Sequence, residues 1–324
     1  MIAWVGVVAF FVAMGATLVL IPRLRAAGIT GKDLHKPGQP EIPEMGGLAF
    51  VAGFTLGVLL AIALEAFIPT VLPVDFLALL AVLSTVLLTA LVGILDDLLG
   101  MHQAVKAFLP VVAALPLVAI RVGHTTLSIP LIGQVNFGLA YSLALVPLGV
   151  TGAANAVNML AGFNGVELGM GLVAMGGLAA VAWKLGEPTA LALLLAGMGA
   201  AFGVLLFNWY PARIFVGDVG TLSIGAILAA SCIVGNFEAA GLIVIFPYAL
   251  DFVLKALHGF PSKGWAGELC SDGKLRCPAN GPVGLGQAIL KVTGGLHERT
   301  LTLVLVGFEA LCAAGAALLY WLRG

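Results

Sequence analysis

Long apolar stretches separated by shorter polar connections form the main pattern of this chain. A helix that crosses the hydrocarbon core of a membrane needs about 20 mostly apolar residues. Ten stretches approach that length, and the pattern therefore predicts an all-α, polytopic membrane protein with about ten transmembrane helices. The predicted spans are 2–21, 46–68, 77–95, 105–120, 138–156, 167–183, 188–207, 219–234, 239–257 and 301–322, of which 105–120 is short and contains Pro110 and Pro116.

The composition agrees with this fold class. Of 324 residues, 61% are hydrophobic and 10% are charged, whereas a soluble domain has about 25% charged residues. Apolar stretches continue along the whole chain, so we expect a single integral-membrane domain, 1–324. The net charge of −1 gives no support for a nucleic-acid partner.

The basic residues are distributed unequally between the two sides of the predicted bundle. Ten crossings place both termini on the same side, and twelve of the fifteen basic residues then fall on the other side, against Arg121, Lys184 and Arg323. Because basic loops stay in the cytosol, we expect both termini outside. The predicted cytosolic loops are near 23–45, 96–106, 156–167, 208–218 and 258–300, and they include Lys263.

The sharpest polar feature is the pair Asp96-Asp97, at the end of an apolar run. A carboxylate in a membrane helix costs about 2.5 to 3.5 kcal/mol on insertion scales, so it usually has a function. With Asp218 and the amide of Asn158, the pair offers the few hard oxygen ligands that suit Mg²⁺. Lys106 adds a cation for phosphate, and no His/Cys cluster indicates zinc or iron. The pattern favours phosphoryl chemistry at a membrane surface.

Each of these residues also has a purely structural interpretation. The acidic pair could cap a helix end, and Asp218 could be an N-cap before an apolar run. Asn158 could bond between helices, and Asp251 with Lys255, spaced i and i+4, could form an ion pair. What favours a functional site is that the polar segments all fall on the same predicted membrane face. A transporter or flippase remains an alternative, although transporters usually place acids near the midplane within inverted repeats.

Four motifs carry a family resemblance. They are Asp33-Leu34-His35-Lys36 with Ile42-Pro43-Glu44, Asp96-Asp97 with Lys106, Asn155 through Glu167, and Asn208 through Asp218. On these motifs the chain resembles the polyprenyl-phosphate N-acetylhexosamine-1-phosphate transferases, across nearly its whole length. It is most similar to their eukaryotic and archaeal type, which uses UDP-GlcNAc and dolichyl phosphate.

The resemblance implies a Mg²⁺-dependent transfer of GlcNAc-1-phosphate from UDP-GlcNAc to a polyprenyl, dolichyl-type phosphate, with release of UMP. Mn²⁺ is the expected substitute metal. The implied metal ligands are Asn158, Asp218 and Asp97, and the implied catalytic residues are Asp96, Asp97, Lys106 and Asp218. Uridine is expected to contact Gly162, Asn164, the backbone of Leu34 and, by stacking, Phe215. Lys36 and Glu44 are expected to organise the substrate site, to which Glu167 also belongs.

The last cytosolic loop departs from the family pattern. The eukaryotic enzymes carry Arg-His-Arg after a Cys-Pro, whereas Cys277-Pro278 is followed here by Ala279-Asn280-Gly281. Arg276, Asn280 or His297 is expected to take the place of these sugar-facing cations, and another UDP-sugar donor is the alternative. The bacterial His-rich motif is also absent from this loop, which disfavours a cell-wall precursor as donor. The resemblance further implies a homodimer in the plasma membrane of a prokaryote or the endoplasmic reticulum of a eukaryote, with the active site facing the cytoplasm.

Overall fold

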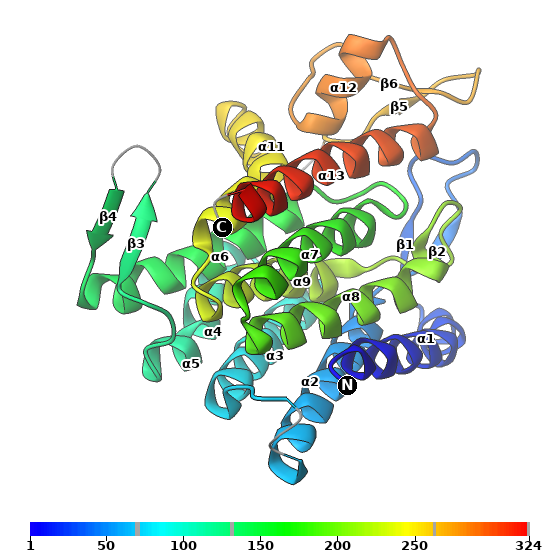
Figure 1. Cartoon of the computed structure of the whole chain (residues 1–324). Coiled ribbons are helices and arrows are strands. Elements are labelled where there is room, and N and C mark those ends of the chain that lie inside the picture. The colour runs from blue at the N-terminus through cyan, green and yellow to red at the C-terminus, as the bar shows by residue number, and fades with distance from the viewer. Residues whose placement is uncertain (69–71, 130–132, 262–263, 323–324) are drawn as a thin grey trace.

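The described part of the protein is mostly helical, with three small antiparallel hairpins (Figure 1). The computed structural model describes the whole chain except residues 69–71, 130–132, 262–263 and 323–324. Lys263 and Arg323, two of the basic residues counted for the orientation, therefore lie outside the described residues. The hairpins are β1–β2 (Thr30–Lys32, Glu41–Pro43), β3–β4 (Thr126–Ile129, Gly133–Asn136) and β5–β6 (Glu268–Leu269, Leu275–Arg276).

Eight helices are long and apolar enough to cross a membrane among the described residues. They are α1 (Ala3–Ala26), α2 (Gly47–Phe67), α3 (Phe76–Leu99), α6 (Val146–Met159) with the π-helical turn Tyr141–Leu145, α7 (Val166–Leu185), α8 (Pro188–Asn208), α9 (Gly217–Val234) and α13 (Glu298–Leu322). The all-α, polytopic membrane fold is thereby confirmed. Each of the eight overlaps a span predicted from the sequence.

The two remaining predicted spans are not simple helices. Span 239–257 is a bent pair, α10 (Glu238–Val244) and α11 (Phe246–Leu257), whose axes differ by 59°. Span 105–120 is the shorter pair α4 (Gln103–Ala113) and α5 (Leu115–Ala119). Proline explains these breaks, because it donates no backbone hydrogen bond and clashes with the preceding turn. Pro116 and Pro247 lie in the first turns of α5 and α11, where a proline is tolerated.

Glycine allows α9 to pack closely against its neighbours on both sides. Helix α9 contacts both α3 and α6. A Cβ atom on Gly93 of α3 would lie 2.5 Å from the Cα of Val219, which a real side chain could not tolerate. This close packing carries the end of α3, with Asp96 and Asp97, to the start of α9, with Asp218.

We expect Gly93→Ala to lower the free energy of unfolding by about 1 to 3 kcal/mol, because it overpacks the contact between α3 and α9. The matched control is Gly15→Ala in α1, where a Cβ atom would meet nothing within 4 Å. Thermal unfolding of the purified protein in detergent measures both. Equal unfolding temperatures for the two variants would contradict the packing described here.

The polar connections gather at one end of the bundle. Figure 1 shows β1–β2 and the segment with α12 (Leu285–Thr293) at one end of the helices and β3–β4 at the other. The chain leaves the first end after β1–β2 and crosses the bundle repeatedly. It returns to the first end in the connections after α3, α6 and α8. Which end faces the cytosol stays a prediction from the basic residues.

Candidate active site

A cavity of about 870 Å³ opens at the end where the polar connections meet. Residues from β1, α4, α6, α7, α8, α9, α11 and the loops between them form its wall. Among the described residues, this wall includes nine that the sequence predicted for the site, namely Leu34, Glu44, Lys106, Asn158, Gly162, Asn164, Glu167, Phe215 and Asp218. The fold thus brings together residues that are up to 184 positions apart (34 to 218).

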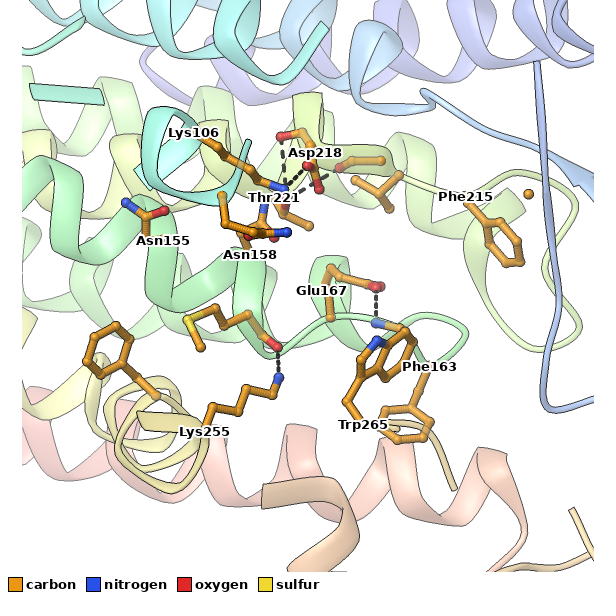
Figure 2. A pocket seen from close by; sticks show the side chains of 18 of the residues that line it. Lys106, Asn155, Asn158, Phe163, Glu167, Phe215, Asp218, Thr221, Lys255 and Trp265 are labelled. Carbon is orange, nitrogen blue, oxygen red and sulfur yellow. Dashed lines mark hydrogen bonds and ion pairs between the residues drawn. The ribbon is translucent and has the colours of Figure 1, made fainter. Parts of the chain in front are cut away.

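Lys106 joins two acidic residues from different helices, and Figure 2 shows its pair with Asp218. Its Nζ lies 2.8 Å from Oδ2 of Asp96 and also pairs with the carboxylate of Asp218. The backbone N–H of Met101 donates to the other oxygen of Asp96 at 2.8 Å. Two carboxylates from different helices thus share one ammonium group at this end of the cavity.

Asp97 contacts the backbone at the start of α9 rather than the cavity. Its Oδ1 accepts a hydrogen bond from the N–H of Asp218 at 2.9 Å, and its Oδ2 accepts from Val219 at 3.3 Å. A carboxylate that accepts the first free N–H groups of a helix stabilises that helix start. Asp97 therefore holds Asp218 in place, and its part as a metal ligand stays a prediction.

Asn158 differs from its neighbour Asn155 in having an unused amide. The Nδ2 of Asn155 donates to the carbonyl oxygens of Ala107 and Thr151. The Nδ2 of Asn158 is buried and has no hydrogen-bond partner among the described residues. Figure 2 shows the Asn158 amide beside Lys106 and Asp218. The unused Nδ2 is a hydrogen-bond donor and suits an acceptor such as a phosphate oxygen. The oxygen ligands that a small, hard cation such as Mg²⁺ prefers are the amide oxygen of Asn158 and the carboxylates of Asp96 and Asp218.

The connection from α6 to α7 is shaped by two glycines and one acid. Gly162 has φ +114° and Gly165 has φ +80°, conformations that side chains disfavour. The buried carboxylate of Glu167 accepts a hydrogen bond from the N–H of Gly162 at 2.7 Å. Glu167 therefore sets the shape of the loop beside Asn158.

Asn164 is held by three segments that are remote from it in the chain. Its backbone N–H donates to Glu298 at 2.8 Å, its Nδ2 donates to Asp33 at 3.2 Å, and its Oδ1 accepts from the N–H of Ala212 at 2.8 Å. Both ends of the amide thus already have partners, and the expected contact with uridine stays a prediction.

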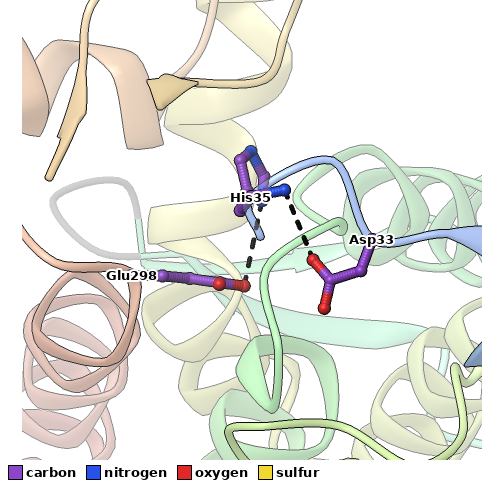
Figure 3. A group of neighbouring side chains, drawn as sticks. All are labelled: Asp33, His35 and Glu298. Carbon is purple, nitrogen blue, oxygen red and sulfur yellow. Dashed lines mark hydrogen bonds and ion pairs between the residues drawn. The ribbon is translucent and has the colours of Figure 1, made fainter. Parts of the chain in front are cut away.

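A second acidic cluster lies next to the cavity (Figure 3). Asp33, His35 and Glu298 are buried, and their potential ligand atoms lie within 4.8 Å of one another. The ammonium group of Lys36 already supplies the positive charge here: it pairs with Glu298 and lies 3.3 Å from Oδ2 of Asp33. It also lies 4.2 Å from the centre of the Tyr210 ring. Lys36 does not line the cavity and instead connects the loops behind its wall.

Glu44 and Phe215 come from two loops that are bonded through their backbones. The N–H of Phe215 donates to the carbonyl of Pro43 at 2.8 Å, and Gly46 donates to the carbonyl of Phe215 at 2.7 Å. Both side chains line the cavity. Burial, and to a lesser extent the charge of Asp218, raises the pKa of Glu44 above its usual value.

Comparison with known proteins identifies the family. Residues 79–236 match the family described as glycosyl transferase family 4. A protein of Saccharolobus solfataricus named as a putative UDP-N-acetylglucosamine–dolichyl-phosphate N-acetylglucosaminephosphotransferase is 36% identical over 315 residues, which are 96% of this chain and 94% of that protein. The chain belongs to glycosyl transferase family 4. The predicted family is confirmed, and with it a transferase rather than a transporter.

Other relatives in the family come from different lineages. The UDP-N-acetylglucosamine–dolichyl-phosphate N-acetylglucosaminephosphotransferase of Dictyostelium discoideum is 27% identical over 367 residues, covering 96% of this chain and 88% of that protein. The phospho-N-acetylmuramoyl-pentapeptide-transferase of Streptococcus thermophilus is 29% identical over 265 residues, covering 76% of each. The similarity to the former spans nearly the whole bundle.

The residues expected to replace the family's sugar-facing cations do not reach the cavity. Arg276 pairs with Asp272 at 2.7 Å on the hairpin β5–β6, with both side chains well exposed. Asn280 is exposed, and His297 lies 3.0 Å from the carbonyl of Gly273. None of the three belongs to the described cavity wall. The structure does not bring these residues to the other predicted site residues.

Trp265 and Lys255 are among the wall residues that were not predicted for the site from the sequence alone. Trp265 lines the cavity from the connection between α11 and α12; a lone tryptophan among glycines was its signal. The expected ion pair between Asp251 and Lys255 is present at 2.8 Å. Lys255 also donates to the carbonyl of Met159 and lines the cavity, so its ion pair connects α11 to the end of α6.

Proposed function

We propose that this enzyme transfers GlcNAc-1-phosphate from UDP-GlcNAc to a polyprenyl phosphate of the dolichyl type. The products are polyprenyl-diphosphate-GlcNAc and UMP. The names of the relatives from Saccharolobus solfataricus and Dictyostelium discoideum support the substrates. The observation that carries the proposal is the arrangement of Lys106 between Asp96 and Asp218, next to the unpartnered amide of Asn158, in a cavity large enough for a nucleotide sugar.

Asp218 and Asn158, with Asp96 or Asp97, would hold Mg²⁺ on the donor diphosphate. When bound, the metal screens the negative charge of the two phosphate groups. Lys106 places a further positive charge beside them and stabilises the charge that develops on the departing UMP. Asp97 holds the start of α9, so the carboxylate of Asp218 keeps its direction.

We propose a direct in-line displacement. An oxygen of the lipid phosphate attacks the donor phosphorus that carries the sugar, and the bond from this phosphorus to the oxygen of UMP breaks. The lipid phosphate is largely ionised near neutral pH, so positioning contributes more than base catalysis. Trapping a phosphorylated Asp96 or Asp97 would contradict this route.

The proposal includes an orientation and an assembly. The cavity end faces the cytosol, because most basic residues belong to the connections predicted at that end. The resemblance to the family supports a homodimer. Labelling of single cysteines in sealed vesicles, at Asp272 for the cavity end and at Gln134 for the hairpin β3–β4, tests the orientation. Reaction of the two positions from the same side would contradict it.

The function is tested by measuring UMP release from the purified enzyme with Mg²⁺, a panel of UDP-sugars and a polyprenyl phosphate. We expect UMP with UDP-GlcNAc only when the lipid phosphate is also present. Preference for a different UDP-sugar would correct the donor alone. Absence of UMP with every donor would refute the proposed reaction.

Removal of divalent metal is expected to abolish UMP release. Dialysis against a chelator should lower the rate to background, because Lys106 is already paired with two carboxylates and cannot by itself screen the charge of two phosphate groups. Mg²⁺ should restore the rate, and Mn²⁺ should restore at least part of it. Full activity after chelation would contradict the metal assignment.

A further inference from the structure

Trp265 lies directly against the loop that carries Gly162. A Cβ atom added to Gly162 would overlap two ring atoms of the indole. The φ angle of Gly162, +114°, independently disfavours any side chain at this position. The indole therefore packs on the backbone of Gly162, which has no side chain, and the ring forms part of the cavity wall.

The backbone on both sides of Trp265 is fixed by one buried side chain. Gln287 of α12 is 1% exposed. Its Nε2 donates to the carbonyl oxygens of Gly264 at 2.7 Å and of Ala266 at 2.8 Å. Its Oε1 accepts from the N–H of Val283 at 2.9 Å. These two carbonyl groups directly precede and follow Trp265, so Gln287 sets where the indole lies.

The indole belongs to an aromatic part of the wall. The ring of His35 stacks on Phe163 with centroids 4.9 Å apart and lies edge-on to Trp265 at 6.5 Å. Figure 2 shows Phe163 and Trp265 across the cavity from Lys106 and Asp218. One wall thus carries Lys106 and Asp218, and the facing wall carries aromatic rings together with Lys255 and Glu167. A ligand that fits both has phosphate groups and a ring with a flat apolar face.

We propose that Trp265 is a donor-binding residue whose indole packs against a ring of the nucleotide sugar, and that Gln287 positions it. This rests on the proposed function. The ring is either the uracil or the sugar, since both have a flat face that an indole can cover. This role is assigned to Trp265 rather than to Arg276 or Asn280, because those two residues do not reach the cavity.

The experiment measures binding of UDP-GlcNAc and of UMP, with Mg²⁺, by isothermal titration calorimetry. We expect Trp265→Ala to weaken UDP-GlcNAc binding about ten-fold or more, and Trp265→Phe to recover part of the loss. An equal loss for UMP would assign the contact to uracil. Unchanged UMP binding would assign it to the sugar.

Gln287→Ala tests the positioning role through the fluorescence of Trp265. The other four tryptophans are replaced by Phe for this measurement. We expect UDP-GlcNAc to change the emission of Trp265 when Gln287 is present, and this change to be lost in Gln287→Ala. A residue with only a structural role would leave the ligand-dependent change intact.

Trp4→Ala is the matched control, because Trp4 lies on α1 and is 60% exposed. It should bind both ligands as the wild type does. Wild-type affinity in Trp265→Ala, or tighter binding because the indole occupies the ligand's place, would overturn the inference. If the wild-type protein bound neither ligand and released no UMP, the proposed function would fail, and the inference with it.

Discussion

Replacing Asp218 by Asn is expected to lower the rate of UMP release about 100- to 1000-fold or more at saturating substrates. The Asp218 carboxylate contacts Lys106 and lies beside the unpartnered amide of Asn158 (Figure 2). The substitution keeps the shape of the side chain and the backbone hydrogen bond to Asp97, but removes the negative charge. A divalent cation and Lys106 then lose the carboxylate that they share. The transfer of the sugar phosphate is therefore expected to become slower.

The measurement compares the turnover number of the variant with that of Asp272→Asn. Asp272 is also paired with a basic residue, but the pair lies on the exposed hairpin β5–β6. We expect this control to keep wild-type activity, and both variants to unfold near the wild-type temperature. Comparable activity of the two variants would remove Asp218 from the catalytic centre.

Replacing Lys36 by Met is expected to destabilise the fold by about 3 to 5 kcal/mol, because it leaves buried charges without a partner. The side chains of Asp33 and Glu298 are each 3% exposed, and Lys36 contacts both. The same ammonium donates to Oδ1 of Asn164 at 3.2 Å. Its loss should therefore also loosen the loop between α6 and α7.

Thermal unfolding in detergent measures this effect, with Arg276→Met as the control. The ion pair of Arg276 with Asp272 is 49% and 40% exposed, so its loss should cost about 0 to 1 kcal/mol. Lys36→Met combined with Glu298→Gln should recover part of the stability, because one uncompensated charge is removed. Equal shifts for Lys36→Met and Arg276→Met would show that the buried cluster does not stabilise the fold.

The membrane fold could be predicted from the chain because hydrocarbon imposes a simple rule. Apolar runs of sufficient length must become helices whose backbone groups are all internally bonded. Eight predicted spans meet this rule as continuous helices. The runs 105–120 and 239–257 have sufficient apolar character, but proline breaks both of them. Only the coordinates give the angle of 59° between α10 and α11.

Glu309 shows where apolar patterning is insufficient. Glu309 is fully buried, and neither of its carboxylate oxygens has a hydrogen-bond partner among the described residues. Its position along α13 could be estimated from the sequence, but which face of the helix meets α7 and α10 depends on how the helices pack.

The residue types of the candidate site were predictable, whereas their individual tasks were not. Asp96, Asp218, Asn158 and Lys106 were predicted together, because acids and amides at the ends of apolar helices are costly unless they have a function. The structure separates Asp97 from them as the residue that holds the start of α9. It also places Lys36 behind the cavity wall, paired with acids that are remote in the chain.

By itself the sequence determined a polytopic helical membrane fold and the motifs that meet at its cavity, since hydrophobic length and motif spacing are local properties. Only the tertiary structure decided which side chains share a partner and which residues of the last loop reach the cavity. Trp265 rather than Arg276 or Asn280 lines the wall, because Gln287 binds the backbone around it. Such contacts depend on residues far apart along the chain.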